Sequence, residues 1–149
     1  MLYGRKGEVA DGEAALVPIG KAAVRRAGSD LTIVAAMAMV ETALAAASEL
    51  AAQGIEAEVI DLRTLRPLDA GTIAISAEKT KRLVVVEEGP ATGGYASDVI
   101  ALAVEEAGPI AARRVAMPDI PIPFSAPLED WARPSVERIA AAARALAGS

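Results

Sequence analysis

Short apolar stretches alternate along this chain with longer stretches in which apolar residues recur every three to four positions. The first pattern is typical of buried strands and the second of amphipathic helices. Residues 31–36 (LTIVAA) and 82–87 (RLVVVE) predict the clearest strands, because apolar, mostly β-branched side chains occupy both of their faces. Residues 40–51 carry apolar positions at helical spacing, and Gly54 suits the end of that helix.

The stretch 56–69, EAEVIDLRTLRPLD, organises the rest of the prediction. It predicts a strand, a turn at residues 63–67 and a helix capped by Asp69, because an aspartate there accepts hydrogen bonds from the first backbone N–H groups of a helix. We expect strands at residues 22–26, 31–36, 56–61, 82–87 and 113–117, and helices at 40–51, 70–79, 95–107 and from 134 onward. This alternation predicts an α/β domain with a mostly parallel sheet and helices on both faces.

Two segments fall outside this alternation. Residues 1–15 are charged and glycine-rich, with Leu2 and Tyr3 as the only apolar anchor, so we interpret them as a linker or arm before a domain of residues 16–149. Residues 118–134 hold five of the nine prolines, and we expect neither a helix nor a central strand there. Phe124 and Trp131 in this segment either anchor a partner or cover an end of the core.

The amino-acid composition excludes several catalytic mechanisms and argues against several kinds of partner. The chain has no cysteine and no histidine, which excludes disulfides, thiolate catalysis and Ser-His-Asp or Cys-His mechanisms within it. A net charge of −5 argues against nucleic acid or an anionic membrane as main partners. No stretch approaches the roughly 20 apolar residues of a membrane span, and the first residues lack an apolar signal core, so a cytoplasmic location is expected.

The loop EEGPATGG, residues 87–94, follows a buried strand and precedes a helix, which is where phosphates often bind. Its spacing, G-x-x-x-G-G, matches no dinucleotide or P-loop motif, so we favour a turn or a subunit contact over a phosphate site. Glu87 and Glu88 place two carboxylates at the end of a strand, where an acid with a raised pKa is conceivable. Adjacent strand residues point to opposite sides, however, so we favour separate roles for them.

Two further patterns have two interpretations each. Arg63 and Arg66 could bind an anion together, or could pair with Asp61 and Asp69, and we favour the pairing. The alanine-rich face of the helix at 40–51 either packs on its own sheet or forms a symmetric dimer contact. We favour the sheet.

The chain resembles the C-terminal domain of the beta subunit of thiamine-diphosphate-dependent 2-oxo acid dehydrogenases, the decarboxylating components of the pyruvate, branched-chain 2-oxo acid and acetoin dehydrogenase complexes. The resemblance covers almost the whole chain, from about Leu2 to Leu146. The matching pieces are LYG, PIGKAAVRRAGSDLTIVA, ETALAAASELAAQGIEAEVIDLRTLRPLD, TIAISAEKTKRLVVVEEG, PDIPIPFSAPLED and SVERI. The most specific is VIDLRTLRPLD followed by KT-x-RLVVVEE.

The resemblance implies the transketolase C-terminal-domain fold, a three-layer α/β/α domain of five strands with an antiparallel first strand at one edge. The strand order of the family places the topological switch between residues 31–36 and 82–87, with a crevice lined by the two loops that follow these strands. The candidate crevice residues are Met37, Met39, Glu41, Glu87, Glu88, Gly93 and Gly94.

The family enzymes decarboxylate a 2-oxo acid on thiamine diphosphate with magnesium and pass the acyl group to lipoyl groups. The cofactor is held by a preceding domain and by a GDG motif of the alpha subunit. No GDG occurs here, so we assign no catalytic, cofactor-binding or metal residue to this chain.

The resemblance therefore implies an assembly and docking role, with the chain inactive alone. The implied partners are the alpha subunit, a second beta subunit and the lipoyl acyltransferase core, and the isolated domain could form a homodimer. The candidate docking residues are Asp119, Phe124, Glu129, Asp130 and Trp131. Two alternatives stay open: a domain of a transketolase or 1-deoxyxylulose-phosphate synthase type enzyme, and a free-standing small-ligand or protein-binding module.

Overall fold

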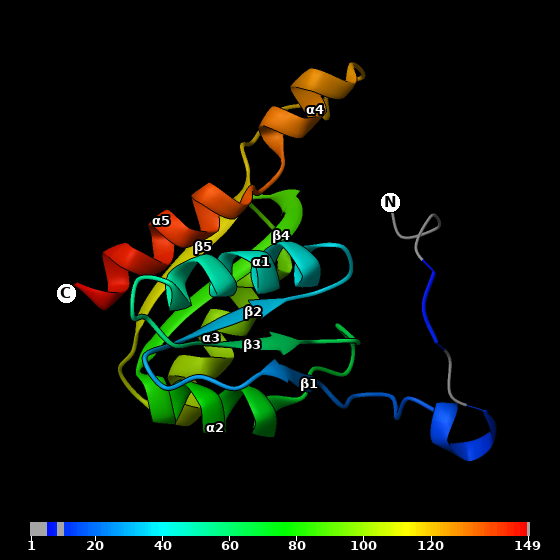
Figure 1. The fold of residues 1–149 in the computed structure, drawn as a ribbon, viewed down its shortest axis with the longest axis vertical. Helices are drawn as coiled ribbons and strands as arrows, with labels where there is room; N and C mark the ends of the chain where they lie inside the picture. Colours follow the sequence, from blue (N-terminus) through cyan, green and yellow to red (C-terminus); the bar gives the residue numbers. More distant parts are fainter. Residues whose placement is uncertain (1–5, 9–10, 149) are drawn as a thin grey trace.

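The computed structural model describes residues 6–8 and 11–148, and it forms one sheet between two layers of helices (Figure 1). The strands are β1 (Ala23–Arg26), β2 (Leu31–Ala35), β3 (Ala57–Asp61), β4 (Arg82–Pro90) and β5 (Ala111–Met117). The helices are α1 (Met39–Ala51), α2 (Ala70–Thr80), α3 (Tyr95–Ala107), α4 (Ala126–Ala132) and α5 (Val136–Ala147), and a 3₁₀ helix, η1, spans Gly12–Ala15. The predicted anchor at Leu2 and Tyr3 lies outside the described residues.

The five strands are ordered β1-β3-β2-β4-β5. β2 pairs in parallel with both β3 and β4, β4 pairs in parallel with β5, and β1 pairs antiparallel with β3. The mostly parallel sheet with one antiparallel edge strand is therefore confirmed. After β2 the chain adds β3 on one side of it and then β4 on the other side. The topological switch point therefore lies between β2 and β4.

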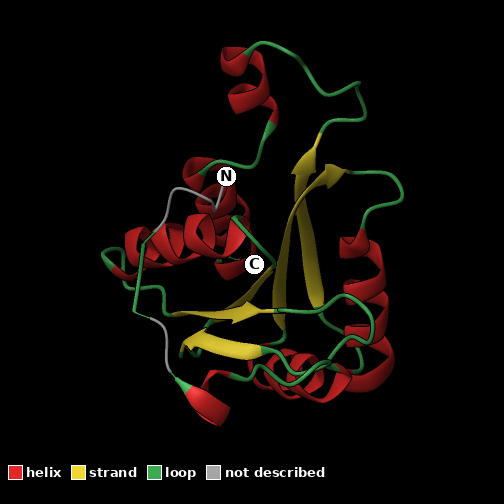
Figure 2. Ribbon diagram, turned by 90° about the vertical axis from the view of Figure 1, so that its right-hand side faces the viewer, coloured by secondary structure: helices red, strands yellow, loops and turns green. Residues whose placement is uncertain are grey.

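The two faces of the sheet bury separate apolar cores. On one face α1 and α5 cover Ile33, Val59 and Val84. On the other face α2 and α3 cover their strand neighbours, such as Val34 and Ile60. Figure 2 views the sheet from the side, with helices on both faces and one short helix standing apart at the top. The alanine face of α1 is buried in the first of these cores, so these small side chains pack on the chain's own sheet.

The prediction that residues 118–134 contain no helix is wrong, because α4 forms within them. Pro127 lies in the first turn of α4, where a backbone N–H has no partner inside the helix and its loss costs little. Pro134 also falls outside the closing helix, which is capped by Ser135. β4 extends beyond its predicted end as far as Pro90, which pairs with Met117 of β5.

The outer strands of the sheet each carry two consecutive arginines, Arg25 and Arg26 in β1 and Arg113 and Arg114 in β5. The Arg26 guanidinium donates to the carbonyl oxygen of Ala57 at 2.6 Å. In the part of the chain that the structure describes, no helix is long and apolar enough to cross a membrane.

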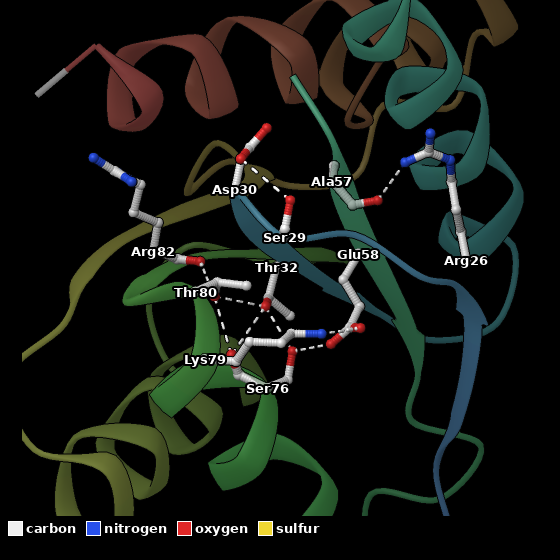
Figure 3. A network of polar contacts seen from close by, with 10 residues as sticks. All are labelled: Arg26, Ser29, Asp30, Thr32, Ala57, Glu58, Ser76, Lys79, Thr80 and Arg82. Carbon is white, nitrogen blue, oxygen red and sulfur yellow. Dashed lines mark hydrogen bonds and ion pairs between the residues drawn. The ribbon is translucent and has the colours of Figure 1, made fainter. Parts of the chain in front are cut away.

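A polar network lies between the sheet and α2 (Figure 3). The buried carboxylate of Glu58, on β3, accepts from the Ser76 hydroxyl and pairs with Lys79. The Thr32 hydroxyl, on β2, bonds to the hydroxyls of Ser76 at 2.6 Å and Thr80 at 2.8 Å. The network fixes α2 on the sheet at the end opposite the crevice loops.

Candidate functional site

A cavity of about 250 Å³ opens at the switch point, where the loops after β2, β3 and β4 meet. Its lining residues are Ala36, Met37, Arg63, Leu65, Glu88, Gly89 and Tyr95. Met37 and Glu88, both crevice candidates from the sequence, thus line the same cavity. Arg63, Leu65 and Tyr95 were not among the crevice candidates, because a sequence does not show how a loop folds over its neighbours.

Glu88 also borders a second cavity of about 260 Å³ on the side of α1 and α4. The lining residues there are Ala38, Met39, Thr42, Glu88, Asp130, Arg133 and Pro134. The Glu88 carboxylate lies 4.0 Å from the Arg133 guanidinium, and its side chain is about one third exposed. Met39 is almost wholly buried, and Glu41 lies in the first turn of α1.

Glu87 does not face the crevice. It is buried beneath the N-terminus of α3, where one of its carboxyl oxygens accepts a hydrogen bond from the Ala96 backbone N–H at 3.2 Å. The other oxygen has no partner among the described residues. Burial raises the pKa of the Glu87 carboxyl, although the N–H groups of Ala96 and Tyr95 act in the opposite direction. Glu87 and Glu88 therefore occupy separate environments.

Gly94 is the residue that lets Glu87 reach α3. A Cβ at Gly94 would lie 2.3 Å from both carboxyl oxygens of Glu87, far inside van der Waals contact. Gly94 is therefore required for close packing, whereas Gly93 takes a positive φ of 78° and lines a further cavity described below.

Tyr95 fixes the mouth of the first cavity. Its hydroxyl donates to the carbonyl oxygen of Val86 at 2.6 Å. Burial and the negative charge of Glu87 raise the pKa of Tyr95, so its hydroxyl stays protonated and remains a donor at neutral pH.

The predicted pairing of Arg63 with Asp61 and of Arg66 with Asp69 is wrong. The Asp61 carboxylate instead lies 3.4 Å from the guanidinium of Arg25. Asp69 accepts from the backbone N–H groups of residues in α2 and before β1. The side chains of Arg63 and Arg66 make no hydrogen bond or ion pair with any other residue that the structure describes, and both are exposed.

Met37 and Arg63, which both line the first cavity, have φ values of 54° and 56°. Residues other than glycine rarely adopt this left-handed conformation, and strain of this kind concentrates at functional sites. The crevice is thus the most strained part of the described backbone outside glycines, apart from Lys81 at the end of α2.

A wider groove of about 950 Å³ lies between the loop after β3 and the N-terminal half of α3. Its lining residues are Leu65, Arg66, Pro67, Leu68, Gly93, Tyr95, Asp98 and Leu102. The Thr64 hydroxyl holds the loop in shape, because it donates to the carbonyl oxygen of Pro67 at 3.0 Å and accepts from the Gly20 N–H at 3.1 Å. One side of the groove is therefore a loop of fixed shape, and the groove is lined by both apolar and charged side chains.

The docking candidates divide into two groups. Asp119 accepts from the Thr92 hydroxyl at 2.7 Å and from its N–H at 2.9 Å, and these hydrogen bonds hold the pKa of Asp119 below its ordinary value. Both carboxylate oxygens of Asp119 are thus already hydrogen-bonded within the domain. Phe124 is fully exposed, and Trp131 is 67% exposed on α4, which stands clear of the helical layers in Figure 1. Asp130 pairs with Arg133, and Glu129 is half-buried.

The described residues include no group of three or more His, Cys, Asp or Glu side chains that could hold a metal ion. The glycine loop before α3 lies against the Glu87 carboxylate, which occupies the space at Gly94.

The fold and the crevice define a class of protein: a three-layer α/β/α domain with a mostly parallel five-stranded sheet and a crevice at its switch point. The chain belongs to the family described as "Transketolase, C-terminal domain", which matches residues 20–139.

Curated relatives are beta subunits. The chain is 48% identical over 146 residues to the acetoin:2,6-dichlorophenolindophenol oxidoreductase subunit beta of Cupriavidus necator, covering 96% of this chain and 43% of that protein. It is 47% identical over 133 residues to the mitochondrial pyruvate dehydrogenase E1 component subunit beta-1 of Arabidopsis thaliana, covering 86% of this chain and 36% of that protein. The chain is thus homologous to E1 beta subunits and spans less than half of their length.

Among solved structures, a split gene transketolase described as an inactive beta4 tetramer matches with a TM-score of 0.82 and 32% identity, over 95% of this chain and 46% of that one. A 2-oxoglutarate:ferredoxin oxidoreductase from Magnetococcus marinus matches with a TM-score of 0.59 and 14% identity, over 85% of this chain and 19% of that one, which shows the shared fold alone.

Proposed function

We propose that this chain is the C-terminal assembly and docking domain of the beta subunit of a 2-oxo acid dehydrogenase decarboxylating component. Its parent would decarboxylate a 2-oxo acid and transfer the acyl group to lipoyl groups in the cytoplasm. The observation that carries the proposal is the homology to beta subunits over almost the whole chain, in a domain that lacks histidine, cysteine and a metal site in its described part.

The chain alone is expected to be inactive, because thiamine diphosphate and magnesium belong to the other parts of the parent assembly. Purified chain would be incubated with thiamine diphosphate, Mg²⁺ and pyruvate, acetoin or branched 2-oxo acids, with an artificial electron acceptor as the readout. No turnover is expected. Turnover that follows the chain through purification would contradict the proposal.

The docking surface is proposed to centre on the segment that carries Phe124, Glu129, Asp130 and Trp131. Exposed aromatic side chains are typical anchors of protein interfaces, and acidic residues beside them favour a basic partner. The partners proposed are the alpha subunit, a second beta subunit and the lipoyl acyltransferase core. The net charge of −5 supports a basic docking domain on the acyltransferase.

Titration calorimetry with the isolated alpha subunit and with the subunit-binding domain of the acyltransferase tests this surface. Trp131→Ala is expected to weaken at least one of these complexes by about tenfold or more, as the loss of an interface anchor does. Glu105→Ala, on the exposed far end of α3, is the matched control. Equal affinities for the wild type and both variants would show that Trp131 and α4 are not part of the docking surface.

A second candidate function is a small-ligand site in the crevice, as in a sugar-phosphate enzyme of the transketolase type. The observation that favours it is the guanidinium of Arg63 beside the switch-point cavity, which pairs with no other residue in the described part of the chain, together with the split gene transketolase among the similar structures. Melting temperatures would be compared in phosphate, 2-oxo acids and nucleotides. A ligand that stabilises the wild type but not Arg63→Ala would support this function over a pure assembly role.

A further inference from the structure

A hollow of about 500 Å³ lies at the outer edge of the sheet, where α5 packs beside β5 (Figure 1). It shares no lining residue with the cavities at the crevice end. Arginines from two elements line it, Arg113 and Arg114 from β5 and Arg138 from α5. The other described lining residues are small or apolar: Ala91, Ala116, Met117, Pro118 and Ala142. The hollow therefore gathers positive charge in a chain whose net charge is −5.

Two of these guanidinium groups are held in place by uncharged oxygens. The Arg114 guanidinium donates from Nη1 to the carbonyl oxygen of Ala91 at 2.7 Å and to the hydroxyl of Ser97 at 3.0 Å. The Arg138 guanidinium reaches from α5 to the carbonyl oxygen of Ala116, on β5, at 2.6 Å, and its other contacts also go to backbone carbonyl oxygens. Such acceptors orient a guanidinium without cancelling its charge. Since a guanidinium carries N–H donors on all of its nitrogens, Arg114 keeps those of Nε and Nη2 for a ligand.

Arg113 is the third cation of the hollow. It is exposed and makes no hydrogen bond or ion pair with any other residue that the structure describes. Several other arginines of the described chain pair with carboxylates instead: Arg25, Arg26, Arg133 and Arg144. An isolated exposed arginine is simply solvated, but here it lies beside two cations that are already fixed in position.

The carboxylates near the hollow do not neutralise it. Asp119 follows the hollow along the chain, but both of its oxygens accept from Thr92, and the charge of Arg114 adds a smaller lowering of its pKa. The carboxylate of Glu137 is held by hydrogen bonds at the start of α5, which lower its pKa. Glu87, which also feels the charge of Arg114, is buried beneath the N-terminus of α3. None of the three lines the hollow or forms an ion pair with its arginines.

A phosphoryl group suits cations in this arrangement. It carries a charge of about −2 and several acceptor oxygens, so more than one guanidinium can bind it, and arginine is well matched to phosphate geometry. A volume of about 500 Å³ lies within the range of small-molecule sites and leaves room for more than the phosphoryl group itself. The apolar surface of Met117 and Ala142 can contact the remainder of such a ligand.

We propose that this arginine hollow binds the phosphoryl group of a small molecule, an organic phosphate or a diphosphate, at a site separate from the crevice. Arg114 and Arg138 are positioned in advance, so little side-chain freedom is lost when the anion binds. Arginines on β5 also oppose the pairing of sheet edges, but that role does not need the guanidinium that α5 supplies. The inference is independent of the proposed assembly role.

Calorimetry on the whole 149-residue chain tests the site, with pyrophosphate and ADP as separate probes and without divalent cations. An ionic strength of about 0.1 M screens distant charges. Saturable binding of one ligand per chain is expected, and acetate at the same concentration should not compete. Arg113→Ala is expected to weaken binding at least about tenfold, because a charge-assisted hydrogen bond is lost. Since Arg113 is exposed and without a partner in the described chain, this variant is expected to fold, and circular dichroism checks it.

Arg63→Ala is the matched control. Arg63 is also exposed and without a partner in the described chain, but it lines the crevice, so the control removes the same charge at a different place. The affinity of this variant is expected to stay within about twofold of the wild type. Arg113→Lys keeps the charge and loses the planar donor geometry, so its affinity should fall between those of the wild type and Arg113→Ala. In NMR spectra, pyrophosphate should shift the amide signals of β5 and of the loop after β4 in the wild type.

Loss of binding in Arg113→Ala but not in Arg63→Ala supports the inference, and the comparison of ADP with pyrophosphate then shows whether an organic group adds affinity. No saturable binding, or competition by acetate at equal concentration, would overturn it. Equal losses in both variants would overturn it too, since net charge alone would explain them. A loss confined to Arg63→Ala would place the anion in the crevice instead. Because no alpha subunit or acyltransferase enters this experiment, its failure is distinguishable from failure of the proposed function.

Discussion

Asp69 connects three parts of the chain through one carboxylate. It caps α2 by accepting from the Thr72 N–H at 3.2 Å and hydroxyl at 2.9 Å, and it also accepts from the Ala22 N–H at 3.0 Å, just before β1. Burial disfavours the charge of Asp69, but these hydrogen bonds and the nearby Lys21 prevail and hold its pKa below the ordinary value of 3.8. Asp69, at the end of the loop after β3, therefore also holds the edge strand β1 in place.

Asp69→Ala is expected to lower the free energy of unfolding at neutral pH by roughly 2 kcal/mol, because it removes a helix cap and leaves the Ala22 N–H unpaired. A lowered pKa means that this stabilisation is present above pH 3.8 and is lost as the pH falls through the folded-state pKa. Urea denaturation of the wild type and the variant across an acid pH series should show their difference in unfolding free energy becoming smaller as the pH falls. If the difference in unfolding free energy between wild type and Asp69→Ala does not change with pH, the stabilisation does not depend on the charged form of Asp69.

Glu87 is expected to show the opposite dependence. Its pKa is raised above the ordinary 4.5, so the stability that it contributes is present below pH 4.5 and declines as the pH rises through the folded-state pKa. Relative to Glu87→Gln, the wild type should become less stable from acid toward neutral pH. Parallel stability profiles of the two proteins would show that Glu87 does not titrate abnormally.

At the scale of elements, α2 is held by polar contacts as well as by its apolar face. Figure 3 shows Glu58 of β3 and Lys79 of α2 pointing toward each other, next to the hydroxyls of Thr32 and Ser76. Glu58 is only 5% exposed, so its carboxyl oxygens rely on these partners for hydrogen bonds. Lys79 is partly solvated, which limits the strength of the pair.

Lys79→Met is expected to cost about 1–2 kcal/mol of stability, because it leaves the buried Glu58 carboxylate with the Ser76 hydroxyl alone. Replacing both partners, as Glu58→Met with Lys79→Met, should recover most of that loss, since no buried charge remains. Denaturant titration of the two single variants and the double variant measures the coupling. Additive losses would mean that the pair is not coupled.

The elements and the place of the crevice were largely predictable, but the detailed shape of the crevice was not. The strands Leu31–Ala35 and Arg82–Pro90 each contain a run of β-branched apolar residues. Such runs are typical of buried parallel strands, so the sequence predicts both strands. The conformations of Met37 and Arg63 are set by the surrounding fold, since neither side chain prefers a positive φ. The position of Glu87 likewise depends on a close approach at Gly94 that only the three-dimensional packing creates. Proline content alone does not predict α4, because Pro127 lies in the first turn of that helix, where a proline is tolerated.

At the scale of the molecule, the buried apolar core of the described residues runs from Leu31 to Leu146. The segment before β1 still contributes the contacts of Gly20 with Thr64 and of Ala22 with Asp69. A domain that begins at residue 16 keeps both the core and these contacts.

Deleting residues 1–15 is therefore expected to change the free energy of unfolding by less than about 0.5 kcal/mol, as substitutions away from the core do. A longer deletion, of residues 1–22, is the comparison and is expected to be clearly less stable, because Asp69 and Thr64 lose their backbone donors. Thermal denaturation of both truncations measures the difference. A large loss on removing residues 1–15 would contradict the domain boundary.

The paired arginines on β1 and β5 also limit how copies of this domain can meet. Open sheet edges are the usual starting point of amyloid-like stacking, and positive charges on an edge strand oppose it. Joining two sheets of this chain through β1 or β5 would bring the arginine pairs of both copies together. A fibre grown strand by strand through these two edges is thus disfavoured, even at high protein concentration.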